Sequence, residues 1–377
     1  MDKTKLRWGI LGAANIARKN WKAIWNSGNG RVAAVASRSL DKSRQFIAEC
    51  QAQAPFEPRP RALGSYEELI TAAEVDAVYI PLPTALRGQW VKRAAAAGKH
   101  VVCEKPCATS LAELSEMTEA CRQNHVQFMD GVMFVHSRRL ERIREVLDDG
   151  NTVGRIRRIT SAFTFYAPED FYGSNIRARG ELEPFGCLGD LGWYCIRFAL
   201  WTMNLNLPER VTGQMLSDFK YQTSQNPVPT EFSAELFFDG GVTSTFYCSF
   251  VTDLEQWAIV SGDHGHLRLP DFVLPFTGER IGFETGNAFF EVRGCDFEMQ
   301  PGLRRFEAEE HSHSHPTAQE SCLFRQFAEQ VLSGKLNTLW PDMAMKTQAV
   351  MQACLASAQS QGRAVKVENH RLMFQSD

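Results

Sequence analysis

The chain has 377 residues, 44% of them hydrophobic and 23% charged, and its formal net charge is −3. This length suits two domains, and the lack of clustered lysine and arginine argues against a nucleic-acid partner. No apolar run approaches the roughly 20 residues that cross a bilayer, so no membrane partner is expected, and the charged segment Met1–Leu6 lacks the pattern of a secretory signal. The 10 cysteines contain no CxxC pair, which predicts reduced thiols in a cytoplasmic protein.

The first third of the sequence alternates short apolar runs with helical patterns. Strands are predicted at Leu6–Leu11, Arg31–Ser37, Val75–Ile80, His100–Cys103 and Val126–Met129. Helices are predicted between them at Asn15–Trp25, Leu40–Cys50, Tyr66–Ala73, Thr84–Ala97 and Ser110–Gln123. This alternation predicts an α/β fold with a parallel sheet and helices on both of its faces.

The pattern changes after a predicted helix at Val135–Asp149. From Arg155 onward the strands are predicted to be antiparallel, because Asp239-Gly240-Gly241 between two apolar runs is a strong hairpin signal. The strands expected here are Thr230–Phe238, Val242–Phe250, Trp257–Ser261 and His266–Leu269, and the helices are Pro316–Leu332 and Pro341–Gln359. The second part is therefore expected to be an α+β domain with a large, mostly antiparallel open sheet.

A glycine-rich turn follows the first predicted strand. Gly12, Ala14 and Ala17 occupy the three positions of a degenerate G-x-G-x-x-G/A dinucleotide fingerprint. The helix that begins at Asn15 and Ile16 would present its N-terminal amides to a pyrophosphate. The sequence therefore predicts a dinucleotide site at this turn.

The end of the second strand decides which dinucleotide is preferred. An acidic residue there would bind the ribose 2′-hydroxyl of NAD, but this chain has Ser37 and Arg38, with Lys42 one helical turn further on. A hydroxyl and a guanidinium suit a 2′-phosphate. We therefore predict NADP as cofactor, with NAD as the alternative.

A lysine stands at the end of the predicted strand His100–Cys103, in the sequence Glu104-Lys105-Pro106. In open α/β sheets ligands bind at the carboxyl ends of the strands, so Lys105 is placed to reach a bound ligand. A lysine in a desolvated pocket can act as an acid or a base.

Two runs make the family recognisable: Val75-Asp-Ala-Val-Tyr-Ile-Pro-Leu-Pro83, and Ala97-Gly-Lys-His-Val-Val-Cys-Glu-Lys-Pro106. Together with Asp190-Leu-Gly-Trp-Tyr194, they resemble the glucose–fructose oxidoreductase/inositol dehydrogenase (Gfo/Idh/MocA) family, and the resemblance covers nearly the whole chain. It implies an NAD(P)-dependent dehydrogenase or reductase that acts on CH–OH groups of a sugar, polyol or cyclic diol. It also implies cofactor contacts from Pro81, Leu82, Pro83 and Glu104.

The resemblance assigns catalytic roles to Lys105, Asp190 and Tyr194. Lys105 would contact the nicotinamide ribose and the substrate hydroxyl, and the other two would line the substrate pocket opposite it. The spacing of four puts Asp190 and Tyr194 on one helical face. Either Tyr194 transfers the proton while Lys105 lowers its pKa, or Lys105 transfers the proton while Tyr194 orients the substrate. Arg177 is a further substrate-binding candidate, or it holds its own loop.

Several positions depart from the family pattern. Thr84 and Arg87 replace the usual Asn and His, so Arg87 either alters the charge preference for substrate or faces solvent. Asp130 stands where members often have Glu. Arg138 and Arg139 are expected to be solvated or structural.

The remaining biased patch is His311-Ser-His313-Ser-His315. An extended strand would place its three imidazoles on one side and could hold a metal. Without cysteine or clear carboxylate partners, no metal site is predicted.

These observations predict an NAD(P)-binding domain at residues 1–126 and a substrate-binding and oligomerisation domain at residues 127–377. The helix at about 341–360 would pack near the domain junction. The resemblance implies contact between subunits through the exposed sheet face, and an uncovered sheet of apolar alternation needs such cover, so we predict a homo-oligomer, a dimer or tetramer. The alternatives are a catalytically silent member that senses the cofactor or binds a partner, and an enzyme that keeps its cofactor bound while it cycles two substrates.

Overall fold

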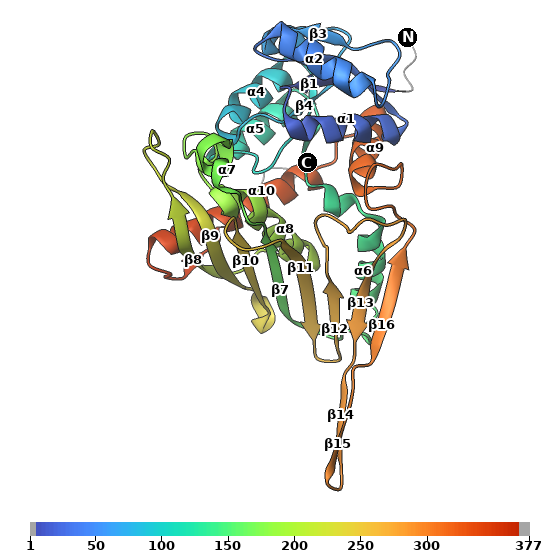
Figure 1. The fold of residues 1–377 in the computed structure, drawn as a ribbon, viewed down its shortest axis with the longest axis vertical. Coiled ribbons are helices and arrows are strands. Elements are labelled where there is room, and N and C mark those ends of the chain that lie inside the picture. Colours follow the sequence, from blue (N-terminus) through green and yellow to red (C-terminus); the bar gives the residue numbers. More distant parts are fainter. Residues whose placement is uncertain (1–4, 369–377) are drawn as a thin grey trace.

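The computed structural model describes residues 5–368. Most of the segment Met1–Leu6, on which the expectation of no secretory signal rests, lies outside the described residues, as do residues 369–377. Two sheets dominate the molecule, one above the other in Figure 1, and helices fill the space between them. Among the described residues, no helix combines the length and the apolar character needed to cross a membrane.

The first sheet is parallel, as predicted, and it has six strands, one more than the five that the sequence predicts. Its order is β3 (Arg61–Leu63), β2 (Gly30–Ala36), β1 (Leu6–Leu11), β4 (Ala77–Ile80), β5 (His100–Cys103) and β6 (Phe128–Asp130). Its helices are α1 (Asn15–Ser27), α2 (Leu40–Gln51), α3 (Tyr66–Thr71), α4 (Thr84–Ala96) and α5 (Leu111–Gln123). Serine side chains cap α2, α3 and α5, which explains why these helices begin where the sequence predicts.

The second sheet has nine strands. Its order is β16 (Leu303–Ala308), β13 (Ile281–Gly286), β12 (His266–Leu269), β11 (Glu255–Gly262), β7 (Ile156–Thr164), β10 (Thr243–Ser249), β9 (Val228–Phe237), β8 (Arg210–Phe219) and β17 (Val365–Lys366). The predicted hairpin is confirmed: β9 and β10 pair antiparallel around the short 3-10 turn η4 (Asp239–Gly241). The sheet is mostly antiparallel, as predicted, and the exception is the pair β7 and β10, which is parallel. Apolar alternation fixes which face is buried and does not encode which strand is the neighbour.

The predicted helix at Val135–Asp149 is two elements. A 3-10 turn, η1 (Met133–His136), precedes α6 (Arg138–Asp148). Between them Ser137 has an extended backbone, with φ −75° and ψ 134°, and its hydroxyl accepts a hydrogen bond from the amide of Arg139. A serine that caps a helix in this way cannot lie inside it, which is why the prediction of one helix is wrong.

The segment Phe185–Met203 lies between β7 and β8 of the second sheet. It contains a π-helical turn, η3 (Leu188–Gly192), that runs directly into α8 (Trp193–Thr202). Before it lie the short helix α7 (Glu169–Ser174) and the 3-10 turn η2 (Ile176–Ala178). Helices α6, α8 and α10 (Leu339–Gln359) cover one face of the nine-stranded sheet.

Helix α9 (Gln319–Leu332) returns to the first sheet, next to α1 (Figure 1). There the Trp8 ring packs against Phe324 and Phe327, with ring centroids 5.1 and 5.2 Å apart. Helix α10 then bridges the two halves, because Gln352 accepts a hydrogen bond from the Leu111 amide at the start of α5. Helices α9 and α10, near the end of the chain, thus complete the hydrophobic core of the first domain.

A long two-stranded hairpin projects from the far end of the nine-stranded sheet (Figure 1). Its strands are β14 (Phe289–Arg293) and β15 (Asp296–Gln300), and they pair only with each other. In the chain the hairpin lies between β13 and β16, the two strands at the edge of the sheet. In space it extends beyond that edge (Figure 1).

Candidate active site

A cavity of about 770 Å³ lies between the carboxyl ends of the first sheet's strands and the upper edge of the second sheet. One wall comes from the glycine turn and the ends of β4 and β5, through Ala14, Pro81 and Lys105. The other wall comes from β7, η2 and η3, through Phe163, Arg177 and Asp190. Neither sheet forms this cavity alone.

The predicted dinucleotide turn is on the cavity wall. Gly12 has φ +126°, and a Cβ there would stand 3.0 Å from the side chain of Leu82, so a larger residue is disfavoured on both counts. Ala14 precedes α1 without capping it, and the first turn of α1 holds no acidic side chain. The amide end of α1 is therefore open to an anion, and Ala14, Asn15 and Ile16 line the cavity there.

The predicted specificity residues lie beside this turn, at the end of β2. Ser37 is buried, and its amide donates to the Leu63 carbonyl, whereas Arg38 and Lys42 are exposed. Within residues 5–368 neither cation forms an ion pair closer than 4.0 Å. Ser39 caps α2, and within residues 5–368 the Arg38 guanidinium forms no hydrogen bond.

Lys105 lies opposite Asp190, as the sequence predicts. Its Nζ is 2.8 Å from Asp190 Oδ1, and it also donates to the Asp190 backbone carbonyl. Both side chains are mostly buried. The pair joins the end of β5 to the π-helical turn η3, 85 residues later in the chain.

Arg177 completes this charged cluster. Its Nε is 2.8 Å from Asp190 Oδ2, so the Asp190 carboxylate is held between two cations. Burial raises the pKa of Asp190, but the charges of Arg177 and Lys105 outweigh burial and hold this pKa well below its ordinary value. Asp190 in turn raises the pKa of Arg177. Asp190 is therefore ionised at neutral pH and orients both cations.

The Tyr194 ring lies beneath Lys105, whose Nζ is 4.5 Å from the ring centroid. Tyr194 is buried and lines the cavity, and its hydroxyl forms no hydrogen bond with any of the residues described. Burial, and then the negative charge of Glu104, raise the pKa of Tyr194 well above its ordinary value. The expectation that Lys105 lowers the pKa of Tyr194 is therefore wrong, because desolvation of the phenolate dominates.

Glu104 belongs to a buried chain of hydrogen bonds behind Lys105. The Tyr79 hydroxyl donates to Glu104 Oε1 at 2.6 Å and accepts from Asn20 Nδ2 at 2.7 Å. The Lys105 amide donates to the second carboxylate oxygen of Glu104. This chain ties α1, β4 and β5 together directly behind the lysine, and Glu104 also lines the cavity.

Arg87 lies on the cavity wall and does not face solvent, so only the first of its two expected roles stays a prediction. It is buried, and its guanidinium donates to the carbonyls of Leu82 and Pro106. Glu183, from the loop before η3, accepts hydrogen bonds from the amide and the hydroxyl of Thr84 and lies 3.9 Å from Arg87. Arg87 therefore holds the backbone that follows β4 and β5, and the expectation that it faces solvent is wrong.

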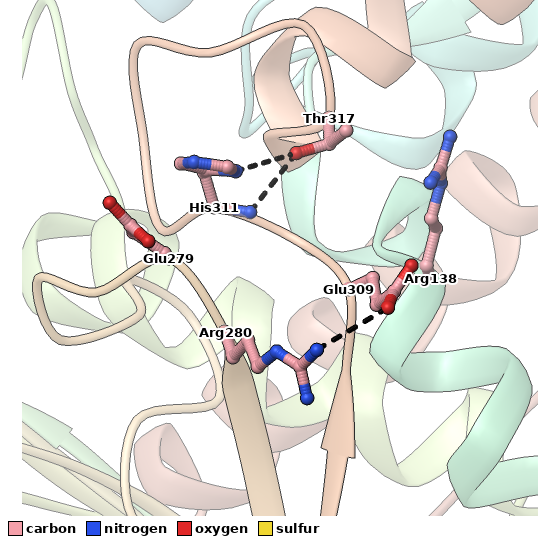
Figure 2. A pocket seen from close by; sticks show the side chains of 6 residues that line it. All are labelled: Arg138, Glu279, Arg280, Glu309, His311 and Thr317. Carbon is pink, nitrogen blue, oxygen red and sulfur yellow. Dashed lines mark hydrogen bonds and ion pairs between the residues drawn. The ribbon is translucent and has the colours of Figure 1, made fainter.

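Two other arginine–carboxylate pairs are buried and structural. Asp130 pairs with Arg197 at 2.7 Å, and Arg139 pairs with Asp271. Arg138, by contrast, is exposed and lines a second, shallow pocket together with Arg280, Glu309 and His311 (Figure 2).

The histidine patch is a loop and not a strand. His311 and His315 stack with centroids 3.5 Å apart, and both rings lie within hydrogen-bonding distance of the Thr317 hydroxyl, while His313 is exposed. Figure 2 shows His311 turned toward Thr317. No cluster of three metal-ligating side chains exists within residues 5–368.

Sequence reasoning missed several cavity residues. The Lys19 ammonium lies 3.1 Å from the sulfur of Met133, and burial lowers the pKa of Lys19. Phe163 and Phe165 supply an apolar wall. These residues carry no local signal, since the side of a helix or strand that meets the cavity depends on how the two sheets are joined. Of the predicted cofactor residues, Pro81 and Leu82 reach the cavity, while Pro83 precedes α4.

Comparison with known proteins matches most of the chain to one family. Residues 6–132 match the oxidoreductase family with an NAD-binding Rossmann fold, and residues 140–268 match the GFO/IDH/MocA C-terminal domain. D-xylose 1-dehydrogenase (NADP(+)) 2 of Haloferax volcanii is 32% identical over 70% of this chain and 75% of that protein. Trans-1,2-dihydrobenzene-1,2-diol dehydrogenase of Mus musculus is 31% identical over 74% of this chain and 80% of that protein.

A solved structure extends the likeness to the whole fold. The 3-ketoreductase from Actinomadura kijaniata, in complex with NADP and TDP-benzene, has 25% sequence identity and a TM-score of 0.77. The alignment covers 94% of this chain and 98% of that chain.

Proposed function

Because this chain belongs to the Gfo/Idh/MocA oxidoreductase family, we propose that it transfers a hydride between NADP and a hydroxyl-bearing carbon of a sugar, polyol or cyclic diol. The relatives support this class of reaction, since one is named for NADP(+) and D-xylose and another for a cyclic trans-diol.

The observation that carries the proposal is the meeting of Lys105, Asp190 and Tyr194 in one cavity with the open end of α1. A lysine at a strand end is by itself an ordinary surface residue. Here it is mostly buried, paired with a carboxylate and stacked on a tyrosine whose hydroxyl has no other partner among the residues described. A buried lysine–carboxylate pair beside a tyrosine in a cleft, with the pKa values of Asp190 and Tyr194 shifted, is typical of a catalytic site.

The residues present fit an NADP molecule. The close approach of Gly12 to Leu82 and the uncapped start of α1 suit a pyrophosphate, which Ala14, Asn15 and Ile16 would hold. The unengaged Arg38, with Ser37 and Lys42, would hold the 2′-phosphate. Pro81, Leu82, Pro83, Glu104 and Lys105 would border the nicotinamide end. When bound, the nicotinamide supplies the hydride donor or acceptor.

We assign proton transfer to Tyr194 and orientation to Lys105. Two of the three N–H groups of the Lys105 ammonium are directed at Asp190, which leaves one for a substrate oxygen. The Tyr194 hydroxyl is a protonated donor at neutral pH because its pKa is raised. In carbonyl reduction Tyr194 would give its proton to the new hydroxyl, and in oxidation it would receive one. Arg177 would bind a further substrate oxygen while it keeps Asp190 ionised.

The apolar wall suits a ring-shaped substrate. Phe163 and Phe165 stand on the side of the cavity that lies opposite the glycine turn, and Leu254 and Leu274 close it from neighbouring loops. Apolar side chains with a few convergent polar groups are usual in small-molecule sites. Sugar rings and cyclic diols present both kinds of surface.

We further infer a cytoplasmic homo-oligomer, a dimer or tetramer. All 10 cysteines lie in the described residues and none forms a disulfide, which supports a reducing compartment. One face of the nine-stranded sheet has no helix layer packed on it in Figure 1, which supports contact between subunits.

The first test is a fluorescence titration of the purified protein with NADPH and with NADH. We expect NADPH to bind at least about tenfold more tightly. A screen of aldoses, polyols and cyclic trans-diols with NADP then follows, with Lys105→Ala as the blank. NADP reduction that depends on one substrate class and is lost in the blank supports the proposal.

Other outcomes discriminate the alternatives. Tight NADPH binding without turnover of any sugar, polyol or diol would favour a member of the family that only senses the cofactor. Protein that retains NADP through desalting would favour an enzyme that cycles two substrates on a fixed cofactor. If neither nucleotide binds, the proposal fails.

A further inference from the structure

The projecting hairpin β14–β15 has two chemically different faces. Its pairing puts Phe290 opposite Met299 and Val292 opposite Phe297, so these four side chains share one face. The other face carries Glu291, Arg293 and Glu298, together with Phe289, Asp296 and Gln300, and Arg293 pairs with both glutamates at 2.8 and 3.3 Å. The hairpin is therefore amphipathic, although it packs on nothing in the described chain (Figure 1).

The apolar face of the hairpin is largely open to solvent. Phe290, Val292, Phe297 and Met299 are between 55% and 75% exposed, and the rings of Phe290 and Phe297 lie 5.7 Å apart. A two-stranded ribbon alone is marginally stable in water, and contiguous exposed apolar patches mark interaction sites. An apolar face of this kind implies a partner that covers it.

One exposed apolar residue joins the hairpin to the edge of the nine-stranded sheet. Leu303, the first residue of β16 after the hairpin, is 60% exposed. The strand register places it in one row with Gly286, His266 and Ser261, on the face that the helices do not cover. The hairpin thus extends the edge of an uncovered sheet face.

That sheet face has the size and charge pattern to meet a copy of itself. Nine strands at about 4.8 Å spacing and roughly 20 Å length give about 800 Å², the area that each partner contributes to a standard interface. The register sets Arg305, Glu284 and Arg268 side by side at one end, while Glu235 lies on the same face further across the sheet. Charges of both signs on one face suit pairing about a two-fold axis.

We propose that the hairpin β14–β15 is a dimerisation arm that lays its apolar face on a second copy of this chain. The arm would extend contact between the two uncovered sheet faces. Its four charged side chains are three acidic and one basic, which disfavours an anionic membrane as the partner. The proposal rests on the homo-oligomer inferred under the proposed function, and not on the cofactor or on catalysis.

The test compares two variants by sedimentation over a range of protein concentrations. The arm variant carries Phe290→Ser, Val292→Thr, Phe297→Ser and Met299→Gln. The matched control carries Glu291→Gln and Glu298→Gln on the other face of the same strands. We expect the dimer dissociation constant to rise at least about 100-fold in the arm variant and less than about threefold in the control. Replacement of residues 289–300 by two glycines should act as the arm variant does, and unchanged NADPH binding and circular dichroism show that each variant is folded.

A spin label gives a second readout. Cys295, at the hairpin tip, is the one exposed cysteine of the ten, so it can be labelled selectively. A docked arm predicts one narrow distance between the two labels of a dimer, and the arm variant should lose it.

Three results overturn the proposal. A dimer that is unaffected by the arm variant and gives a broad label distance shows that the sheet faces pair without the arm. A wild-type chain that is monomeric at all concentrations contradicts both the dimerisation arm and the proposed homo-oligomer. A monomer that sediments with vesicles of neutral or anionic lipid through Phe290 and Phe297 shows that the arm contacts a membrane.

Discussion

The two ends of the central cavity are built in different ways. The end proposed for the cofactor comes from short stretches of chain, Gly12–Ile16 and Ser37–Lys42, and relies on backbone amides and exposed cations. The end proposed for catalysis joins Lys105 to Asp190 and Tyr194, across a sequence gap of 85 residues or more, and its charges are mostly buried. One end is local and solvated, and the other is assembled by the tertiary fold and desolvated.

This difference governs how each end should respond to mutation. An exposed cation interacts through solvent and salt, so its removal changes affinity modestly. A buried charge has no solvent to replace a lost partner, so its removal is costly. Five predictions, from the largest expected effect to the smallest, separate the two ends.

Replacing Lys105 should have the largest effect. Lys105→Met removes the group that orients the substrate oxygen and leaves Asp190 paired only with Arg177. We expect turnover to fall about 10³- to 10⁴-fold while NADPH affinity changes only a few-fold. Lys92→Met, at an exposed ion pair with Glu116, is the control and should leave turnover unchanged. A loss of less than tenfold in Lys105→Met would contradict the assignment.

Replacing the hydroxyl of Tyr194 should come next. Tyr194→Phe should lower kcat about 10²- to 10³-fold, because no proton donor remains at that point of the cavity. Its melting temperature should stay near that of the wild type, since the hydroxyl forms no hydrogen bond within residues 5–368. Tyr247→Phe, whose hydroxyl lies 2.7 Å from Thr252 on the open sheet face, is the matched control. Equal kcat values for Tyr194→Phe and the wild type would show that Tyr194 does not transfer the proton and would favour Lys105 as the proton-transfer residue.

Neutralising Asp190 should destabilise the fold. Asp190→Asn leaves Lys105 and Arg177 as neighbouring cations without their shared counter-charge, which we expect to cost about 2–4 kcal/mol of unfolding free energy. Thermal unfolding measures this loss. Asp41→Asn, at an exposed pair with Arg44, should cost less than about 0.5 kcal/mol. Similar melting temperatures for the two variants would show that the ion pairs of Asp190 do not stabilise the fold.

Removing Arg38 should alter cofactor choice and little else. Arg38→Ala should weaken NADPH binding about tenfold and leave NADH binding unchanged, because only NADPH carries the 2′-phosphate. The difference should shrink as salt is raised, since Arg38 is exposed. Arg44→Ala, on helix α2 directly after Arg38 and paired with Asp41, is the control. Equal weakening of both nucleotides would place Arg38 elsewhere than at the 2′-phosphate.

The smallest expected effect is on the pH profile. Because burial raises the pKa of Tyr194 above 10.0, the phenol stays protonated at neutral pH and loses its proton only as the pH rises through that raised value. The kcat for carbonyl reduction should therefore vary by less than about threefold between about pH 7 and about pH 10. A falling limb near pH 8 that disappears in Tyr194→Phe would show that Tyr194 titrates much lower.

Much of the first sheet could be predicted from local signals. The strand His100–Cys103 and the helix end at Gln123 agree with the structure to the residue, and serine caps explain the helix starts. The second half was less predictable. The break at Ser137 depends on which hydrogen bond its side chain makes, and the parallel pairing of β7 with β10 depends on strands far apart in the chain.

Within the candidate site, recognition of the family, rather than spacing, pointed to Asp190 and Tyr194. Spacing indicated only that they share a helical face, and that face proved to begin with a π-helical turn. The sequence did not show that Arg87 is buried, because its partners, the carbonyls of Leu82 and Pro106, follow two different strands and meet it only in the folded domain. Lys19 and Phe163 gave no sequence signal at all.

The sequence by itself determined the parallel α/β domain, the dinucleotide turn at Gly12 and the family, because these depend on residues close together along the chain. Only the tertiary structure decided which charges are buried, which way the pKa of Tyr194 moves and that a hairpin stands free with one apolar face. Burial and desolvation arise between segments distant in sequence, so no local pattern encodes them.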